Sequence, residues 1–240
     1  MAAGHYSVWE AVSHGLESQA LDWIAWARTP GHDAYWSYRD AFFALMPAPG
    51  LQTLDVGCGE GRVSRDLAAR GHRVVGLDAS PTLVRAAQHA HPEGEYVVGL
   101  AEALPFTDAS FDLVVAYNSL MDVGDMPRAI AEAARVLQSG GRFCACIVHP
   151  IAFAGKWAGA ERDATFVITG SYLEPGPWSE TQERGGLRMT FANRRFPLQD
   201  YSRALEDAGL LIEAMREPAH ATSPRWSRLP GFLLFRALKR

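Results

Sequence analysis

The stretch that decides the fold is Leu-Asp-Val-Gly-Cys-Gly-Glu-Gly at residues 54–61. The apolar run 51–56 leads into it and is typical of a buried strand, while the spacing of apolar residues over 62–69 predicts a helix after it. Between the two, glycines let the backbone approach a ligand closely, and the start of the helix offers unpaired N–H groups. The stretch therefore predicts a ligand site at a strand-to-helix turn.

Two carboxylates indicate which ligand suits this turn. Asp55 comes directly before the glycines, where a pyrophosphate would meet a like charge, and Arg62 stands where a dinucleotide fingerprint would need its last glycine. A ligand with an ammonium and a sulfonium fits better. Asp78 ends the next expected strand, about 20 residues further on, where a carboxylate can accept the hydroxyls of a ribose. Asp78 serves either kind of cofactor.

Strand and helix patterns alternate along most of the chain, with short connections. Further strands are expected at 73–77, 96–98, 111–116, 143–148, 210–215 and 232–237, and helices at 80–91, 126–137 and 198–208. Ser80 followed by Pro81 is typical of a helix start. This order predicts an α/β fold with a doubly wound, parallel sheet covered by helices on both faces.

Two segments depart from this pattern. Residues 1–49 read as an aromatic-rich helical cap, and residues 150–196 as an insertion on the substrate side, with a hairpin between 166–172 and 187–191. Residues 50–149 form the expected cofactor-binding core, and 197–240 the C-terminal helix and strands. No linker separates these parts, so we expect a single domain over 1–240.

Composition excludes several classes of protein. The 240 residues are 48% hydrophobic with a formal net charge of −4, which argues against a disordered chain and against a dedicated nucleic-acid binder. No apolar run is long enough for a membrane helix, and no secretory signal is visible. The three cysteines lack a disulfide framework. We therefore expect a cytoplasmic protein with no membrane partner.

Four motifs carry a resemblance to a known family. They are LDVGCGEG at 54–61, VVGLDAS at 74–80, AEALPFTDASFDLVV at 101–115 and ARVLQSGGRF at 134–143. In this order and spacing, over about 95 residues, the chain resembles class I S-adenosylmethionine-dependent methyltransferases, the group that includes ubiquinone and menaquinone biosynthesis enzymes. The resemblance implies a Rossmann-like, mostly parallel seven-stranded sheet with the last strand antiparallel.

The resemblance also implies S-adenosylmethionine as the cofactor and assigns its contacts. Glycines lie under the methionine portion, one carboxylate faces the ammonium, another holds the ribose, and two residues flank the adenine. The implied cofactor-binding residues are Asp55, Gly57, Gly59, Gly61, Asp78, Ala79, Ala101 and Glu102. Leu100 departs from the family, which commonly has an Asp at this position, and so removes the usual acceptor for the adenine amino group.

The implied reaction is an in-line displacement at a methyl group that is already activated, so no metal is required. Catalytic candidates follow the fourth and fifth strands, where ligands bind in open α/β sheets: Tyr117, Asn118 and His149. His149 is the histidine placed to act as a base near neutral pH. The alternative is that it hydrogen-bonds the turn before Pro150.

Aromatic residues outside the core are candidates for the acceptor pocket. Tyr35 and Trp36 in the helical cap and Tyr172 in the insertion can contact the substrate or simply pack in the core. Arg194 and Arg195 can attract an acidic substrate or lie on a solvated face.

We expect a methyltransferase acting on a small-molecule acceptor, whose identity the sequence does not give. Three alternatives remain at this point: an RNA methyltransferase, an NAD-dependent oxidoreductase, and a non-catalytic module that binds S-adenosylmethionine. No sequence feature predicts the oligomeric state.

Overall fold

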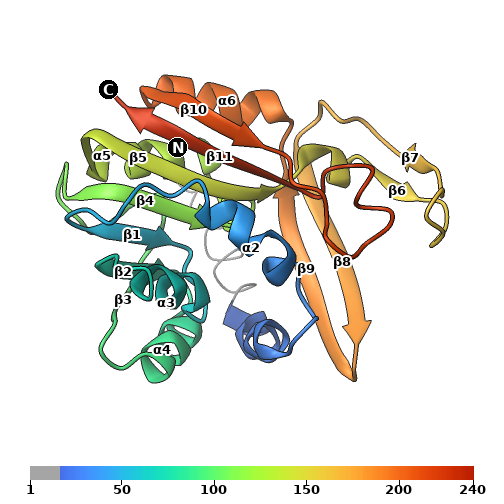
Figure 1. The fold of residues 1–240 in the computed structure, drawn as a ribbon, viewed down its shortest axis with the longest axis horizontal. Helices are drawn as coiled ribbons and strands as arrows, with labels where there is room; N and C mark the ends of the chain where they lie inside the picture. The colour runs from blue at the N-terminus through green and yellow to red at the C-terminus, as the bar shows by residue number, and fades with distance from the viewer. Residues whose placement is uncertain (1–16) are drawn as a thin grey trace, which may run out of the picture.

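A computed structural model describes residues 17–240 and contains a seven-stranded sheet with the order β10-β11-β5-β4-β1-β2-β3 (Figure 1). The strands are β1 (Thr53–Val56), β2 (Val74–Asp78), β3 (Glu95–Val98), β4 (Phe111–Tyr117), β5 (Leu137–Val148), β10 (Leu210–Arg216) and β11 (Phe232–Lys239). Strands β1 to β5 pair in parallel, and β11 runs antiparallel to both of its neighbours. The predicted sheet, with its last strand antiparallel, is confirmed.

The central strand β1 lies between β2 and β4. The sheet is extended on one side of β1 by β2 and β3, and on the other side by β4 and β5. Ligands bind at such a switch point, outside the carboxyl ends of the strands. The turn after β1 and the residues that end β2 and β4 therefore meet at one edge. This edge is where the candidate site lies.

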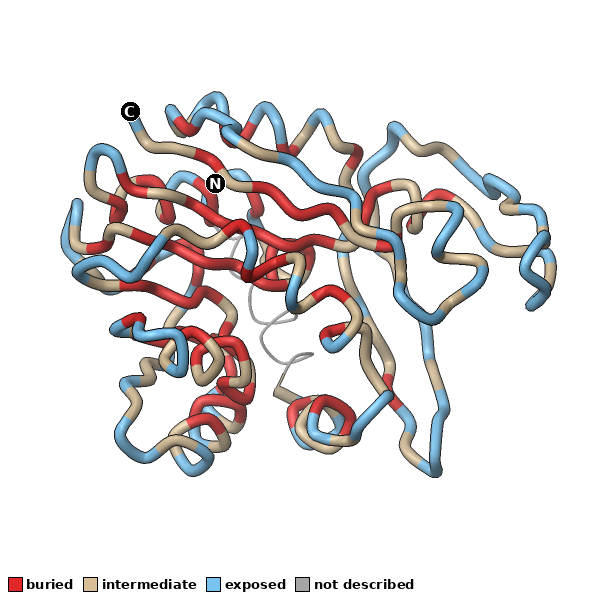
Figure 2. Tube along the Cα trace, in the orientation of Figure 1, coloured by how far each residue is buried: buried red, intermediate tan, exposed pale blue. Residues whose placement is uncertain are grey.

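Helices cover both faces of the sheet. On one face, α2 (Tyr35–Phe43) and α3 (Arg62–Ala68) pack on a cluster that includes Leu113 and Val115. On the other, α5 (Met126–Val136) and α6 (Leu198–Asp207) pack on a cluster that includes Val114. Neighbouring residues of β4 thus alternate between two cores, and Figure 2 shows the central strands buried along most of their length. This burial fixes the strands that present the site.

Helix α4 (Pro81–Ala90) begins where the sequence predicts. The Ser80 hydroxyl accepts a hydrogen bond from the Leu83 N–H at 3.1 Å, and Pro81 occupies the first helical position. Strand β5, in contrast, begins at Leu137 rather than at the predicted residue 143, and its pairing with β4 is interrupted before it resumes at Arg142. Gly140, with φ of +79°, lies in the interruption.

The hairpin predicted in the insertion is wrong. Strand β6 (Gly155–Trp157) pairs with β7 (Phe166–Ile168), and β8 (Gly176–Arg184) pairs with β9 (Leu187–Arg195). The turn between β8 and β9 is Gly185-Gly186, with φ of +55° and +79°. Positive φ at both central residues is the turn geometry that matches the twist of two-residue hairpins, and Gly-Gly supplies it at low steric cost. A short 3₁₀ helix, η1 (Pro150–Phe153), joins β5 to the insertion.

Residues 17–28 form a helix that lies beside the β8–β9 hairpin (Figure 1). Trp23 and Trp26 both make edge-on ring contacts with Phe191 of β9, at centroid distances of 6.4 and 5.9 Å. His32, which follows the helix, bonds the Arg184 carbonyl at 3.0 Å. The first 16 residues of the predicted helical cap lie outside the described residues. Every helix in the described part of the chain is too short or too polar to span a membrane.

Candidate functional site

The glycine turn after β1 is held against β2. The N–H groups of Gly57 and Cys58 both donate to the Leu77 carbonyl, at 2.7 and 2.9 Å. Gly57, Gly59 and Gly61 all have positive φ, the region that glycine adopts most readily. At Gly57 a side chain is also excluded by space, because an added Cβ would lie 2.3 Å from the Ser119 Cβ. The side chain of Ser119, in the segment after β4, therefore packs directly against the main chain of the turn at Gly57.

Asp55 is the next-to-last residue of β1, just before this turn, and is 1% exposed. Its Oδ2 accepts a hydrogen bond from the Ser64 hydroxyl at 2.6 Å, while its Oδ1 is buried with no partner. Burial, with a smaller contribution from the nearby Asp78 carboxylate, raises the pKa of Asp55 to about 7, although the Ser64 hydrogen bond acts in the opposite direction. A buried acceptor without a partner is costly, so this oxygen suits a ligand that brings a positive charge or a hydrogen-bond donor.

Asp78 ends β2, beside Asp55. Its two oxygens accept hydrogen bonds from the N–H groups of Gly59, at 2.8 Å, and Ser80, at 2.9 Å. Burial raises its pKa, and the two backbone bonds act in the opposite direction. The carboxylate therefore ties the glycine turn to the start of α4. Ala79, between Asp78 and Ser80, is partly buried.

The end of β4 and the residue after it present two buried polar atoms. The Asn118 Oδ1 has no hydrogen-bond partner, and the hydroxyl of Tyr117, the last residue of β4, lies beside the Cys146 thiol. Asn118 has φ of +57°, and its N–H donates to the Cys146 carbonyl of β5 at 2.8 Å. Positive φ at a non-glycine residue is uncommon and is found at functional sites. Asn118 thus combines a strained backbone with an available acceptor.

His149 follows β5, as expected, and both of its ring nitrogens are engaged. The Ile151 N–H donates to Nδ1 at 3.1 Å, and Nε2 lies 2.9 Å from Oε1 of Glu217. Because Nδ1 accepts a backbone proton, Nε2 is the nitrogen that carries hydrogen. Burial lowers the pKa of His149, and Glu217 partly offsets this. In this arrangement the imidazole caps η1 and has no free nitrogen to accept a proton.

The residues expected near the adenine are buried, and one of them braces a loop. Ala101 and Glu102 are 8% and 4% exposed. The Glu102 carboxylate accepts hydrogen bonds from the N–H groups of Gly124, at 2.8 Å, and Asp125, at 3.1 Å. The Glu102 carboxylate therefore binds the loop that precedes α5. Leu100, where the family commonly has an acid, is 39% exposed.

The three aromatic candidates for the acceptor pocket do not converge. Tyr35 is buried, with its hydroxyl donating to Asp66 and its ring 5.2 Å from that of Tyr117. Trp36 is 55% exposed. The Tyr172 hydroxyl accepts from the N–H at the start of α6 at 3.3 Å. Tyr35 therefore packs against Tyr117, whereas Trp36 lies on the surface and Tyr172 contacts the start of α6.

Asp122 adjoins the candidate site, and no sequence motif marks it. It lies in the segment after β4, and its carboxylate accepts a hydrogen bond from the Asn193 side chain of β9. Burial raises its pKa to about 7, and the Asp78 carboxylate adds to the shift. Its partner is 71 positions away in an insertion. No local pattern could have revealed this contact.

The helix of residues 17–28 covers the glycine turn. An added Cβ at Gly59 would lie 3.3 Å from the indole nitrogen of Trp23, and Arg28 pairs with Glu60 at 2.9 Å. Near the other end of its described part, the Glu17 carboxylate accepts hydrogen bonds from the hydroxyls of Ser80 and Thr82. Residues 17–28 are therefore held at two points to segments that adjoin Asp78.

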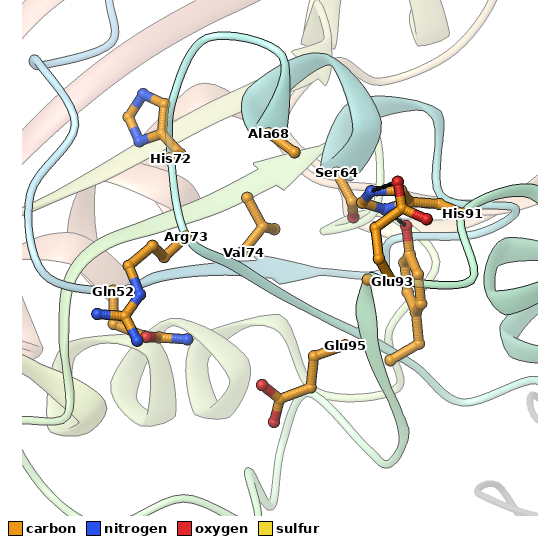
Figure 3. Close-up of a pocket in the computed structure, with 11 residues that line it drawn as sticks. Gln52, Ser64, Ala68, His72, Arg73, Val74, His91, Glu93 and Glu95 are labelled. Carbon is orange, nitrogen blue, oxygen red and sulfur yellow. Dashed lines mark hydrogen bonds and ion pairs between the residues drawn. The ribbon is translucent and has the colours of Figure 1, made fainter.

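A separate cavity lies at the opposite edge of the sheet, near the amino ends of β1, β2 and β3 (Figure 3). It has a volume of about 310 Å³, and its lining includes Gln52, Arg73, His91 and Glu95. None of the candidate site residues lines it. Among residues 17–240, no group of histidine, cysteine and acidic side chains is arranged to hold a metal ion.

Comparisons with known proteins agree with this geometry. A family model described as a methyltransferase domain matches residues 54–145. An uncharacterised methyltransferase of Synechocystis is 41% identical over 107 residues, covering 44% of this chain and 50% of that protein. A ubiquinone biosynthesis O-methyltransferase of Methylobacterium is 34% identical over 152 residues, covering 59% and 61%. The chain thus spans about half the length of these relatives.

Solved structures extend the likeness beyond the matched residues. An S-adenosylmethionine-dependent methyltransferase from Mesorhizobium loti aligns with a TM-score of 0.70 and 27% identity, over 86% of this chain and 98% of that one. A structure from Listeria monocytogenes aligns with a TM-score of 0.68 and 20% identity, over 87% and 100%. The second shows only that the fold is shared.

Proposed function

We propose that the protein transfers a methyl group from S-adenosylmethionine to a small-molecule acceptor, because residues 54–145 match a methyltransferase domain and the chain aligns with an S-adenosylmethionine-dependent methyltransferase structure. The observation that carries the proposal is Asp55, a buried carboxylate with an unpartnered oxygen beside a glycine turn. The edge of the sheet that presents Asp55 also presents the unpartnered Oδ1 of Asn118 after β4. A cofactor and an acceptor can therefore bind next to each other at this edge of the sheet.

The residues present fit the cofactor. Its ammonium suits the unpartnered Oδ1 of Asp55, and the family resemblance assigns its methionine portion to the turn that contains Gly57 and Gly59. Asp78 would hold the ribose, with lone pairs left after its two backbone bonds. When bound, S-adenosylmethionine supplies a methyl carbon that its positively charged sulfur has already activated.

The chain's own residues position the acceptor and exclude water. The Asn118 Oδ1 is available to accept a hydrogen bond from an acceptor hydroxyl or amine, since it has no partner in the structure. The helix of residues 17–28 and the β8–β9 hairpin cover the site from two sides. Holding the attacking atom in line about 3 Å from a methyl carbon removes much of the entropic barrier to transfer.

The comparisons give no support to RNA methylation, nicotinamide chemistry or a non-catalytic role. The relatives that carry substrate names include a ubiquinone biosynthesis O-methyltransferase and a demethylmenaquinone methyltransferase. These two names support a small, ring-containing acceptor for this chain, whereas a relative from Pectobacterium, 36% identical over 103 residues, is named a malonyl-[acyl-carrier protein] O-methyltransferase.

The experiment is to incubate the full chain with methyl-labelled S-adenosylmethionine and, separately, fractions of a metabolite extract, quinone precursors and total RNA. The proposal predicts label in a small organic product. The Asp55→Asn variant, which keeps the Ser64 contact but removes the charge, should transfer far less label. Incorporation into RNA alone would overturn the proposed acceptor class.

A further inference from the structure

One hydrogen bond from a side chain fixes one end of the Asp55 carboxylate. Its Oδ2 accepts from the Ser64 hydroxyl at 2.6 Å, and Ser64 is 2% exposed, so the bond is shielded from water. The other oxygen, Oδ1, is buried without a partner. The fold therefore holds one oxygen of this carboxylate and leaves the other available to a ligand.

Ser64 lies in the first turn of α3, the helix that begins directly after the glycine turn. A serine side chain in a helix often bonds main-chain groups of the same helix. The Ser64 hydroxyl instead reaches back to β1, nine positions earlier in the chain. The bond therefore joins the helix that follows the glycine turn to the strand that precedes it.

Ser64 is the single side chain that secures Asp55. Among residues 17–240, no other side chain donates a hydrogen bond to this carboxylate. On its other side Ser64 borders the cavity of about 310 Å³, so the region behind its hydroxyl is a cavity rather than another hydrogen-bond donor (Figure 3). Removal of the hydroxyl would therefore leave both oxygens of Asp55 without a side-chain partner, and the carboxylate could change its orientation.

We propose that Ser64 is the positioning residue that holds Asp55 in the orientation in which Oδ1 meets the ammonium of the methyl donor. This inference rests on the proposed function. By donating to Oδ2, the hydroxyl restricts rotation of the carboxylate and keeps Oδ1 turned to the ligand. A carboxylate that is already oriented before the cofactor arrives loses less conformational entropy on binding, which favours affinity.

Two ligands that differ in one group isolate this role. S-adenosylhomocysteine carries the ammonium, and its desamino analogue has a hydrogen in place of the amino group. In Ser64→Ala, Asp55 loses its fixed orientation, so S-adenosylhomocysteine should bind about tenfold more weakly. The desamino analogue has no group for Asp55 to bind, so its affinity should not change. A general distortion of the site would weaken the binding of both ligands alike.

Two further variants serve as controls. Ser64→Thr keeps the hydroxyl, and its added methyl group can extend into the adjoining cavity, so the affinity for S-adenosylhomocysteine should match that of the wild type. Thr53→Val removes another buried hydroxyl from β1, two residues before Asp55, where Thr53 bonds Nδ1 of His72 at 3.1 Å. This second variant breaks a bond of the same kind without touching Asp55. The ratio of the two dissociation constants should therefore stay that of the wild type.

The experiment is calorimetric titration of the full chain and these variants with both ligands, by displacement where binding is weak. A loss of affinity for S-adenosylhomocysteine alone in Ser64→Ala, restored in Ser64→Thr, supports the inference. If Ser64→Ala folds poorly, Ser64→Cys, with a weaker donor, should show the same selective loss to a smaller degree.

Equal losses for the two ligands, or an unchanged affinity for S-adenosylhomocysteine in the folded variant, would overturn the inference while leaving the proposed function intact. Failure of the wild type to bind either S-adenosylmethionine or S-adenosylhomocysteine would overturn the proposed function and this inference together.

Discussion

Asp55 shows how the site is prepared for a cation. Without a ligand, its carboxyl group has a pKa of about 7 in the fold, against 3.8 in the unfolded chain. Since the folded state binds the proton more tightly, the contribution of Asp55 to stability is present below pH 4 and is lost as the pH rises through 7. The cofactor-free protein therefore carries a destabilising charge at neutral pH.

Asp55→Asn should remove this penalty. An amide keeps an oxygen for the Ser64 hydroxyl and carries no charge, so the free energy of unfolding of the cofactor-free chain should rise by about 1–3 kcal/mol at pH 8. At pH 5 the gain should be smaller, because Asp55 is then largely protonated. Urea unfolding at the two pH values measures this. A variant less stable than the wild type at pH 8 would contradict it.

Asp78 has a structural role as well as its proposed ribose contact. Asp78→Ala leaves the N–H groups of Gly59 and Ser80 without their acceptor, which should lower the free energy of unfolding by about 1–3 kcal/mol. It should also weaken binding of S-adenosylmethionine. Denaturant unfolding and calorimetry report the two effects separately. Unchanged affinity in a folded variant would remove Asp78 from the cofactor site.

Asn118 combines strain with an available acceptor, so its removal should separate stability from activity. Asn118→Gly relieves the positive φ and should stabilise the fold by about 1 kcal/mol, because glycine adopts this conformation freely. The same change removes the Oδ1 and should slow methyl transfer while leaving cofactor affinity unchanged. Thermal unfolding, calorimetry and transfer of labelled methyl measure the three quantities. A fully active variant would exclude a role for the side chain.

At the scale of elements, the sequence predicted the features that depend on interactions between residues close in the chain. The strands of the core, the glycine turn and the Ser80–Pro81 helix start all rest on periodicity, capping or glycine, and all are found. The pairing predicted for the insertion is wrong because Gly185-Gly186 places the turn between β8 and β9. A Gly-Gly pair between two strand-like runs predicts a tight hairpin centred on itself.

The turn of this hairpin can be tested directly. Gly186→Val places a β-branched residue at φ of +79°, which should cost about 1–2 kcal/mol locally. Nothing lies within 4 Å of an added Cβ there, so the cost comes from the backbone alone. Amide exchange in β8 and β9 should quicken while the central sheet stays protected. Uniformly faster exchange would show instead that the hairpin unfolds together with the core.

At the scale of the whole molecule, the site is assembled from distant segments. The helix of residues 17–28 bonds to the start of α4 and packs on β9, and β9 in turn holds the loop after β4. The positions of Asp55, the glycines and Asp78 at the carboxyl ends of β1 and β2 could be predicted because strand and helix patterns alternate along this part of the chain. Asp122 with Asn193 could not, because the bond joins segments 71 positions apart.

His149 illustrates the same limit. Its place after β5 was predicted, and its contact with Glu217, 68 positions away, was not. That contact, with the Ile151 N–H on the other nitrogen, leaves the imidazole without a free site for a proton. A catalytic role for His149 stays a prediction, and it requires this pair of bonds to change when the acceptor binds.

The central claim is that the edge of the sheet at Asp55 and Asp78 binds S-adenosylmethionine. The measurement that tests it most directly is calorimetric titration of the full chain with S-adenosylmethionine, S-adenosylhomocysteine and NAD at pH 7.5. We expect one-to-one binding of the first two ligands, weakened by Asp78→Ala, and no heat from NAD. Binding of NAD alone, or of none of the three, would contradict the claim.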